Sequence, residues 1–202
     1  MIPNQSTSFN NYLPKDGVVN YWSDFYSGCK SALSFSTLKH TIEWKNDEIY
    51  MFGKKIVTQR KTALYGSTGI VYTYSNATKT ALPWTRELLA IKKDLELHLG
   101  VRFNTCLLNF YHDGSEGMGW HSDDEKEMEK DGVIASLSVG AERKFSFKHK
   151  ITKEKIDIML QSGSLLVMKG ETQRYWLHQL PKTKKVDQPR INLTFRKLNS
   201  NQ

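Results

Sequence analysis

The chain has 202 residues, of which 39% are hydrophobic and 11% aromatic, and this composition suits one globular domain with its own core. No apolar run approaches the roughly 20 residues that a membrane-spanning helix needs, and the first residues show no secretory signal pattern. Cys29 and Cys106 form no CxxC or CxxxC motif, which favours a reducing compartment. These features predict a soluble, intracellular protein.

The net charge of +8 is unevenly distributed along the chain. Residues 1–129 carry 14 Lys and Arg against 15 Asp and Glu, whereas residues 130–202 carry 15 against 6. The stretch from Ile49 to Arg86 holds six basic residues and no acidic one. Such patches attract polyanions, so the charge agrees with nucleic-acid binding, and equally with an ordinary solvated basic surface.

The first half of the chain mixes helical and extended patterns. Residues 1–15 are polar and predict a disordered tail. Apolar residues at helical spacing predict a helix near residues 34–44. Residues 60–76 predict a glycine-punctuated loop that leads into an aromatic strand. A second helix is expected between Thr85 and Gly100. The apolar residues of this segment lie on one helical face: Leu88, Ile91, Leu95 and Leu99.

After residue 101 the pattern changes to short strands. Short strands at this spacing are typical of a sandwich or barrel rather than a parallel α/β sheet. We therefore predict an α+β, mainly β fold, with an N-terminal α/β layer around a C-terminal jelly-roll, in a single domain over residues 16–202. The predicted strands lie within residues 101–114, 133–140, 143–150, 155–160, 162–170 and 190–198.

Two histidines and one aspartate are candidate metal ligands. In an extended segment His121 and Asp123 point to the same face, because they are two residues apart. His178 follows 55 residues after Asp123, just beyond a predicted apolar strand. Two histidines and a carboxylate leave three coordination positions open, an arrangement typical of non-haem Fe(II) oxygenases. The HxD pair alone is a weak indication, and an acidic surface loop is the alternative interpretation.

The last predicted strand, RINLTFR, has two different faces. Its apolar residues alternate with polar ones, so one face can pack into a core. On the polar face Arg190 and Arg196 have Cα atoms about 20 Å apart, since a strand rises roughly 3.3 Å per residue. Their guanidinium groups could bend inward and bind opposite parts of a small dicarboxylate. A strand edge with protective charges is the alternative.

Together these motifs resemble the AlkB family of nucleic-acid dealkylating dioxygenases, most closely its duplex-DNA repair branch. The resemblance covers roughly residues 50–198, and the combination of HxD, a distant histidine and RxNxTxR is highly specific. It implies a double-stranded β-helix (jelly-roll) core over about residues 101–198, preceded by a nucleotide-recognition lid over about residues 45–80. The similar segments are MFGK, RKTALYG, YTYSN, NFYHDG, GWHSDDE, IASLSVG, SLLVMKG, RYWLHQLP and PRINLTFRK.

The resemblance also implies a cofactor and its ligands. Fe(II) would be the metal, with 2-oxoglutarate and O2 as co-substrates. Arg190 would bind the distal carboxylate of 2-oxoglutarate, and Arg196 would lie near the metal-binding end. The implied iron ligands are His121, Asp123 and His178. The further residues expected to hold 2-oxoglutarate are Asn109, Tyr111 and Asn192.

The chemistry implied by the family is the oxidative demethylation of alkylated bases. A ferryl-oxo species hydroxylates an N-methyl group, and the unstable product releases formaldehyde. The implied substrate is DNA that carries N1-methyladenine or N3-methylcytosine, and a duplex base must be flipped out to reach the iron. RNA or tRNA demethylation is one alternative, and a non-catalytic damage-binding protein or a cupin-type metal barrel is another. We expect a monomer, cytoplasmic in a bacterium or nuclear in a eukaryote.

Several residues are candidates for contact with the flipped base. Tyr72 and Tyr74 point to one face of a predicted strand and are candidates for an aromatic wall, although they would equally suit a core. Tyr65 could reach the nucleotide from the lid. Asp124 and Glu125 directly follow a metal ligand, and a carboxylate there would favour cationic methylated bases. The resemblance favours Glu125 over Asp124 in this role.

A basic hairpin is the candidate DNA contact. The resemblance implies that Phe52, in MFGK, enters the base stack as a wedge, whereas the residue by itself would suit a core position. Basic residues around it would hold phosphates, which position the duplex without reading its sequence. These residues are Lys54, Lys55, Arg60 and Lys61.

Overall fold

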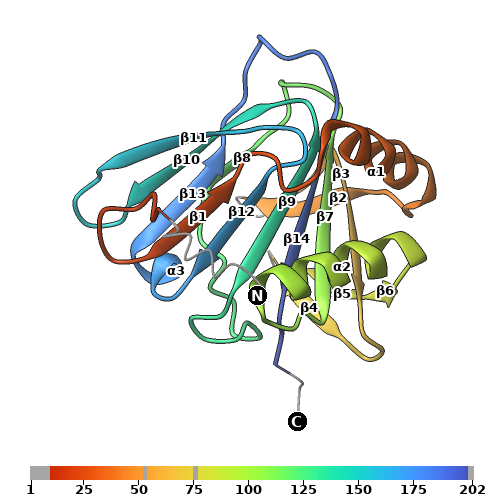
Figure 1. The fold of residues 1–202 in the computed structure, drawn as a ribbon, viewed down its shortest axis with the longest axis horizontal. Coiled ribbons are helices and arrows are strands. Elements are labelled where there is room, and N and C mark those ends of the chain that lie inside the picture. Colours follow the sequence, from red (N-terminus) through yellow and green to blue (C-terminus); the bar gives the residue numbers. More distant parts are fainter. Residues whose placement is uncertain (1–9, 52–53, 75–76, 200–202) are drawn as a thin grey trace, which may run out of the picture.

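A computed structural model of the chain describes residues 10–51, 54–74 and 77–199. Within them two antiparallel β-sheets lie face to face, and two helices cover the outer side of the larger sheet (Figure 1). The α+β, mainly β fold with a jelly-roll core that the sequence predicted is confirmed. None of the described helices combines the length and the apolar character that a bilayer span requires.

The described elements fall into an N-terminal and a C-terminal group along the chain. The N-terminal elements are β1 (Val18–Trp22), α1 (Gly28–Thr41), β2 (Lys45–Met51), β3 (Lys54–Gly66), β4 (Val71–Tyr74), β5 (Ala77–Thr80), β6 (Leu82–Pro83) and α2 (Arg86–Leu99). The C-terminal elements are β7 (Thr105–Tyr111), β8 (Met118–His121), β9 (Ile134–Gly140), β10 (Arg143–His149), β11 (Lys155–Leu160), β12 (Leu165–Lys169), α3 (Thr172–Tyr175), β13 (Trp176–Leu180) and β14 (Arg190–Arg196).

The strands form two main sheets. Within the described part of the chain the larger sheet has the order β1-β12-β9-β14-β7-β3-β2, with β6 beside β3. The smaller sheet has the order β11-β10-β13-β8, and β4 pairs with β5 apart from both. β14 therefore lies in the middle of the larger sheet, between β9 and β7, so both of its edges are paired. This position excludes the alternative that β14 is an exposed edge with protective charges.

The main hydrophobic core lies between the larger sheet and the helices α1 and α2. β14 contributes one apolar face to it, and α2 contributes a stripe at the spacing that the sequence predicted. Burial of each such side chain contributes about 1.5–3 kcal/mol, which fixes the orientation of both elements. The polar face of β14 must then point into the space between the two sheets. The buried apolar residues of these two elements are Leu88, Ile91, Leu95, Ile191, Leu193 and Phe195.

Both ends of α2 follow the sequence prediction. The Thr85 hydroxyl accepts a hydrogen bond from the Leu88 N–H at 3.2 Å and caps the first turn. Gly100 has a φ of 69°, a left-handed conformation that glycine adopts without strain, and ends the helix.

Two segments differ from the prediction. The expected tail over residues 1–15 is wrong for residues 10–15, because Leu13 is buried and Asn11 binds the N–H groups of Leu13 and Val19. Residues 60–66 form the end of β3 rather than a loop, because they pair with β7 up to Gly66. Part of the expected lid region is thus built into the larger sheet.

Glu96, in the last turn of α2, secures the connection from this helix to β7. Its carboxylate accepts hydrogen bonds from the Phe103 N–H at 2.8 Å and from Arg102 at 3.0 Å, and Lys92 lies 2.8 Å away. Burial by itself would raise the pKa of Glu96, but these three partners outweigh burial and lower it. The ionised form is therefore favoured by folding.

We expect Glu96→Gln to destabilise the protein at pH 7 by about 1–3 kcal/mol, because the charge-assisted hydrogen bonds weaken. The folded pKa lies below the unfolded value, so the stabilisation is complete above the unfolded pKa and is lost as the pH falls through the folded pKa. Urea unfolding at neutral and acidic pH should show the difference from wild type shrinking in acid. Asp24→Asn, at an exposed position, is the control and should change stability little.

Candidate active site

Three side chains that could bind one metal ion converge between the two sheets. His121 at the end of β8 and His178 in β13 are register partners, and their ring centroids lie 4.2 Å apart. Asp123 follows two residues after the end of β8, with Oδ1 3.9 Å from Nε2 of His121. One ligand atom from each of the three residues lies within 4.8 Å of the other two. The sequence-predicted triad is thus assembled by the pairing of two strands that are far apart in the chain.

The protonation of the triad suits a cation. Nδ1 of His121 lies 2.8 Å from the Gly119 carbonyl, to which an Nδ1–H can donate, so Nε2 is the ring nitrogen left to face the other two residues. Burial lowers the pKa of His178 to about 3, so this imidazole is neutral at physiological pH. Burial alone would raise the pKa of Asp123, but Arg196 and the histidines outweigh burial and lower it. The neutral imidazole of His178 and the carboxylate of Asp123 are therefore available to one ion, with Nε2 of His121 beside them.

Asp123 is fixed from two directions. Its Oδ2 accepts a hydrogen bond from the Arg196 guanidinium at 2.8 Å, and both side chains are less than 10% exposed. Its backbone N–H donates to Oε1 of Gln173 at 2.9 Å. Arg196 was expected near the metal-binding end of a dicarboxylate. The structure places it at the triad and bonds it directly to a candidate metal ligand.

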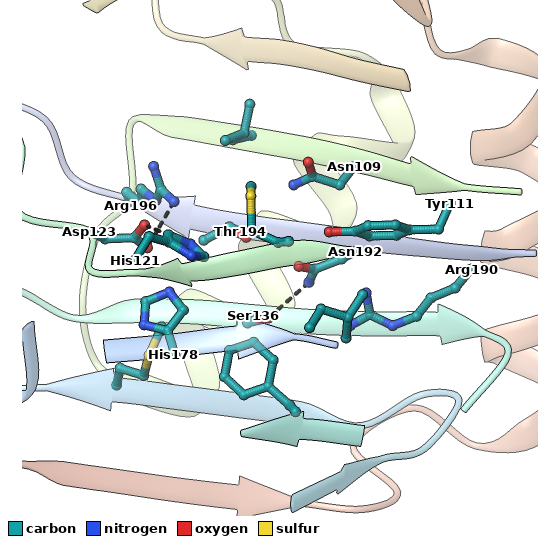
Figure 2. Close-up of a pocket in the computed structure, with 15 residues that line it drawn as sticks. Asn109, Tyr111, His121, Asp123, Ser136, His178, Arg190, Asn192, Thr194 and Arg196 are labelled. Atoms are coloured by element: carbon teal, nitrogen blue, oxygen red, sulfur yellow. Dashed lines mark hydrogen bonds and ion pairs between the residues drawn. The ribbon is translucent and has the colours of Figure 1, made fainter. Parts of the chain in front are cut away.

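The polar face of β14 lines the pocket that begins at the triad. Figure 2 shows Arg196 at the triad end of this face and Arg190 at the opposite end, beside Tyr111. Asn192 donates to the Ser136 hydroxyl at 2.8 Å, and its register partner on β7 is Asn109. The residues of β7 and β14 that were predicted to hold a dicarboxylate all line this one pocket. They are Asn109, Tyr111, Arg190, Asn192 and Arg196.

Arg190 is a buried cation without an acidic partner among the described residues. It is 1% exposed and donates to the Ser138 hydroxyl at 2.9 Å, and its Nε has no hydrogen-bond partner in the described part of the chain. Burial lowers the pKa of Arg190 to about 10, so it is still charged at neutral pH. A buried charge in this condition is costly unless a ligand of opposite charge pairs with it. This end of the pocket is therefore suited to a carboxylate.

Arg143, the first residue of β10, differs from Arg190 in its hydrogen bonds. It is 2% exposed, and its guanidinium donates to the carbonyls of Asp113, Glu116 and Pro181 at 2.8–3.1 Å. Arg143 thereby holds the loop between β7 and β8 against the end of β13. These two arginines thus differ: Arg143 donates to several main-chain carbonyls and Arg190 to one hydroxyl, while the Nε of each has no hydrogen-bond partner in the described part of the chain.

Three sequence-predicted contact residues lie elsewhere than expected. Tyr65 is 2% exposed and belongs to the core beneath the helices, where its hydroxyl accepts from the Glu43 N–H, so the predicted contact with a nucleotide is wrong. Arg60 is 6% exposed and donates to the Met118 sulfur at 3.1 Å, so it is not an open phosphate contact. Lys61 lines a depression with Trp44 on the side of the sheet away from the triad.

The carboxylates that follow the triad remain candidates for substrate contact. Asp124 and Glu125 line a cavity of about 250 Å³ that also includes Asp123 and adjoins the metal-binding residues. Asp124 is exposed and accepts from the Ser122 hydroxyl at 2.9 Å. The structure thus brings both acids to the edge of the triad.

The predicted wedge and aromatic wall are not tested by the structure. Phe52 lies outside the described residues. Tyr72 and Tyr74 lie in β4, and Lys54 and Lys55 begin β3, but their side chains are likewise outside the description. Their roles stay predictions.

The sequence interpretation missed four residues that shape the site. Ser136 and Ser138 alternate in β9 opposite the polar face of β14, and the polar period in IASLSVG could have indicated them. Phe145 stacks on His178 with 5.4 Å between ring centroids. Gln173 reaches the site from α3, and no local pattern in the sequence distinguishes it.

Comparison with known proteins identifies the family of this fold and site. A family model described as the 2OG-Fe(II) oxygenase superfamily matches residues 19–196. The chain belongs to this superfamily. The Fe(II), 2-oxoglutarate and O2 that the sequence predicted are therefore confirmed as cofactor and co-substrates of this enzyme.

Individual relatives narrow the family further. DNA oxidative demethylase ALKBH2 of Bos taurus is 42% identical over 158 residues, which are 74% of this chain and 57% of that protein. The Homo sapiens protein of the same name is 41% identical over 198 residues, which are 93% of this chain and 76% of that protein. The solved structure of OsALKBH1 shares the fold, with a TM-score of 0.63, 17% identity and coverage of 93% and 99% of the two chains. The chain is an AlkB-family dioxygenase.

The residues present fit the superfamily's cofactor and co-substrate. The triad offers nitrogen and oxygen donors in the 2-His-1-carboxylate set that Fe(II) oxygenases use. Nδ1 of His178 is buried and has no hydrogen-bond partner among the described residues. At the far end, Arg190 lacks the carboxylate that a dicarboxylate co-substrate would supply. Both features are what a site built for iron and 2-oxoglutarate requires.

Proposed function

We propose that this enzyme removes methyl groups from N1-methyladenine and N3-methylcytosine in DNA by direct reversal. The observation that carries the proposal is one pocket with a candidate metal triad at one end and, at the other, Arg190, which has no acidic partner among the described residues. The names of the ALKBH2 relatives, together with the basic surface of the chain, support DNA as the substrate class. With iron, 2-oxoglutarate and O2 bound, the site supplies an oxidant that hydroxylates the N-methyl group, after which formaldehyde leaves.

Each residue of the site has a role in this proposal. His121, Asp123 and His178 would hold the iron, and Arg196 holds Oδ2 of Asp123, which leaves Oδ1 to the metal. Arg190 and Tyr111 bind the distal carboxylate of 2-oxoglutarate. Arg196 also lines the pocket at the triad end, which agrees with a place near the metal-binding carboxylate of 2-oxoglutarate.

Neighbouring residues complete the 2-oxoglutarate and base sites. Asn192 is held by Ser136, and Asn109 faces it across the register, so both amides are oriented toward the co-substrate. Asn109 Oδ1 is buried and has no partner among the described residues, which leaves it available to a ligand. Asp124 and Glu125 form an anionic edge that favours a base with a positive charge from methylation.

A direct assay tests the proposed substrate. The enzyme is incubated with Fe(II), 2-oxoglutarate and O2 and with oligonucleotides that carry one methylated base, and product mass is measured. We expect the loss of one CH2 from methylated DNA, together with stoichiometric formaldehyde and succinate. Unmethylated DNA is the control and should yield only slow succinate formation.

The same assay separates DNA from RNA. Duplex DNA, single-stranded DNA and RNA of one sequence are compared at equal concentration. Faster turnover of RNA than of both DNA forms would replace the proposed substrate by RNA. Absence of demethylation from all three, with iron and 2-oxoglutarate bound, would contradict demethylation altogether.

A further inference from the structure

Gln173, in the short helix α3, contacts the main chain of a candidate metal ligand. Its Oε1 accepts the Asp123 N–H at 2.9 Å, and its Nε2 lies 3.4 Å from the sulfur of Met168, which lines the triad pocket. The amide therefore bridges the metal-binding segment and the wall of the pocket. The chemistry proposed above assigns this side chain no role.

Lys150 adds a second connection between α3 and the same segment. Its Nζ donates to the Gln173 carbonyl at 2.9 Å and to the Ser122 hydroxyl at 3.1 Å, and lies 3.8 Å from Asp124. The two residues that flank Asp123 are thus tied to α3 by one ammonium group. Three consecutive residues of the metal-binding segment contact this pair.

α3 is itself held firmly by its neighbours. Thr172 is 1% exposed, and its hydroxyl accepts the Val18 N–H at 2.9 Å and donates to the Lys169 carbonyl at 2.7 Å. Gly17 lies so close that a Cβ there would be 2.8 Å from the Thr172 hydroxyl, so only glycine permits this approach. The Lys150 N–H donates to the Tyr175 carbonyl at 2.7 Å. The helix is therefore fixed to β1, β12 and the end of β10.

Asp123 needs such support because of its place in the chain. β8 ends at His121, so the strand ladder does not fix the backbone of Asp123. Arg196 holds one carboxylate oxygen, but a side-chain contact alone leaves the main chain able to shift. Metal sites require their ligands within about 0.5 Å of the working geometry. A hydrogen bond to the main-chain N–H is the kind of contact that supplies this precision.

We propose that Gln173 is a positioning residue for Asp123. It fixes the backbone so that Oδ1 faces the histidine nitrogens while Oδ2 stays with Arg196. Lys150 supports this arrangement by holding the flanking residues. The inference rests on the proposed assignment of His121, Asp123 and His178 as the metal ligands.

Metal binding by the metal-free enzyme tests the inference without DNA. Co(II) serves as the probe, because its visible spectrum reports ligand geometry as well as affinity. Gln173→Leu keeps the approximate volume but loses the acceptor, and should weaken Co(II) binding by about 10–100-fold with an altered spectrum. Gln173→Glu keeps an acceptor oxygen and should restore the wild-type spectrum. Arg174→Gln, in the same helix but paired with Asp131 at the surface, should match wild type.

The Co(II) spectrum distinguishes correct positioning of Asp123 from a mere gain of negative charge at position 173. An added carboxylate could raise cation affinity in Gln173→Glu without restoring geometry, and an abnormal spectrum in that variant would contradict the proposal. Wild-type affinity and spectrum in Gln173→Leu would also overturn it. Failure of wild type itself to bind Co(II) would instead refute the assignment of the triad. Thermal unfolding of each metal-free variant checks folding, and Gln173→Met replaces Gln173→Leu if the latter does not fold.

Discussion

Arg190→Met is expected to raise the KM for 2-oxoglutarate by on the order of 100-fold, while metal-free protein becomes more stable by on the order of 1 kcal/mol. The first effect follows from the loss of a buried cation that pairs with the co-substrate. The second follows because the guanidinium is buried without an acidic partner among the described residues, and burial lowers its pKa to about 10. Steady-state kinetics with varied 2-oxoglutarate and urea unfolding of the metal-free protein measure the two effects.

Arg143→Met is the matched control for Arg190. Both arginines are buried near Tyr111, but the Arg143 guanidinium donates to main-chain carbonyls. Its removal leaves those carbonyls unsatisfied and should destabilise the protein by about 3 kcal/mol. If Arg190→Met were as destabilising as Arg143→Met, Arg190 would be a structural residue and the assignment of the carboxylate end of the pocket would be wrong.

Asp123→Asn is expected to lower metal affinity and turnover at least about 100-fold. Loss of a residue that only supports a metal ligand commonly reduces metal affinity by about 10–100-fold. Loss of a direct anionic ligand should therefore reduce it by at least the larger factor. The substitution also breaks a buried ion pair with Arg196, which should destabilise metal-free protein by about 3 kcal/mol. Co(II) titration and urea unfolding in the presence of a chelator measure these two changes.

A double-mutant cycle separates the ion pair from the metal site. Arg196→Met should destabilise the metal-free protein, and the Asp123→Asn, Arg196→Met double variant should be less destabilised than the sum of the single variants. Additive losses of stability would show that the two side chains do not act as a pair. Unchanged Co(II) affinity in Asp123→Asn would remove Asp123 from the set of metal ligands.

The candidate residues for metal and 2-oxoglutarate were predictable because their residue types follow short, specific spacings. Arg190 and Asn192 lie on one face of β14 by period-2 alternation. His121 and Asp123 are also two residues apart, although Asp123 lies beyond the end of β8 and is held by Arg196 and Gln173. The apolar residues that alternate with the polar ones in β14 predicted that one face of this strand packs into a core. The structure confirms that face, because Ile191, Leu193 and Phe195 are fully buried.

The lid region was harder to predict because strand register decides which face a residue occupies. The glycines of residues 60–76 suggested a loop, but residues 61–66 pair with β7, and this pairing overrides that preference. Tyr65 pairs with Cys106 and faces the helices, whereas a shift of one residue would have turned it to the pocket. Arg60, one residue before this pairing begins, donates to the Met118 sulfur.

The sequence by itself determined the residues that can bind iron and 2-oxoglutarate, because ligand type and local alternation are written in short motifs. Only the tertiary structure decided how those residues are held. Gln173, Ser138 and Arg143 come from distant segments, and their contacts exist only after the sheets have paired and α3 has packed. The same is true of the contrast between Arg143 and Arg190, since the number of acceptors that each guanidinium meets among the described residues is a property of its surroundings and not of its residue type.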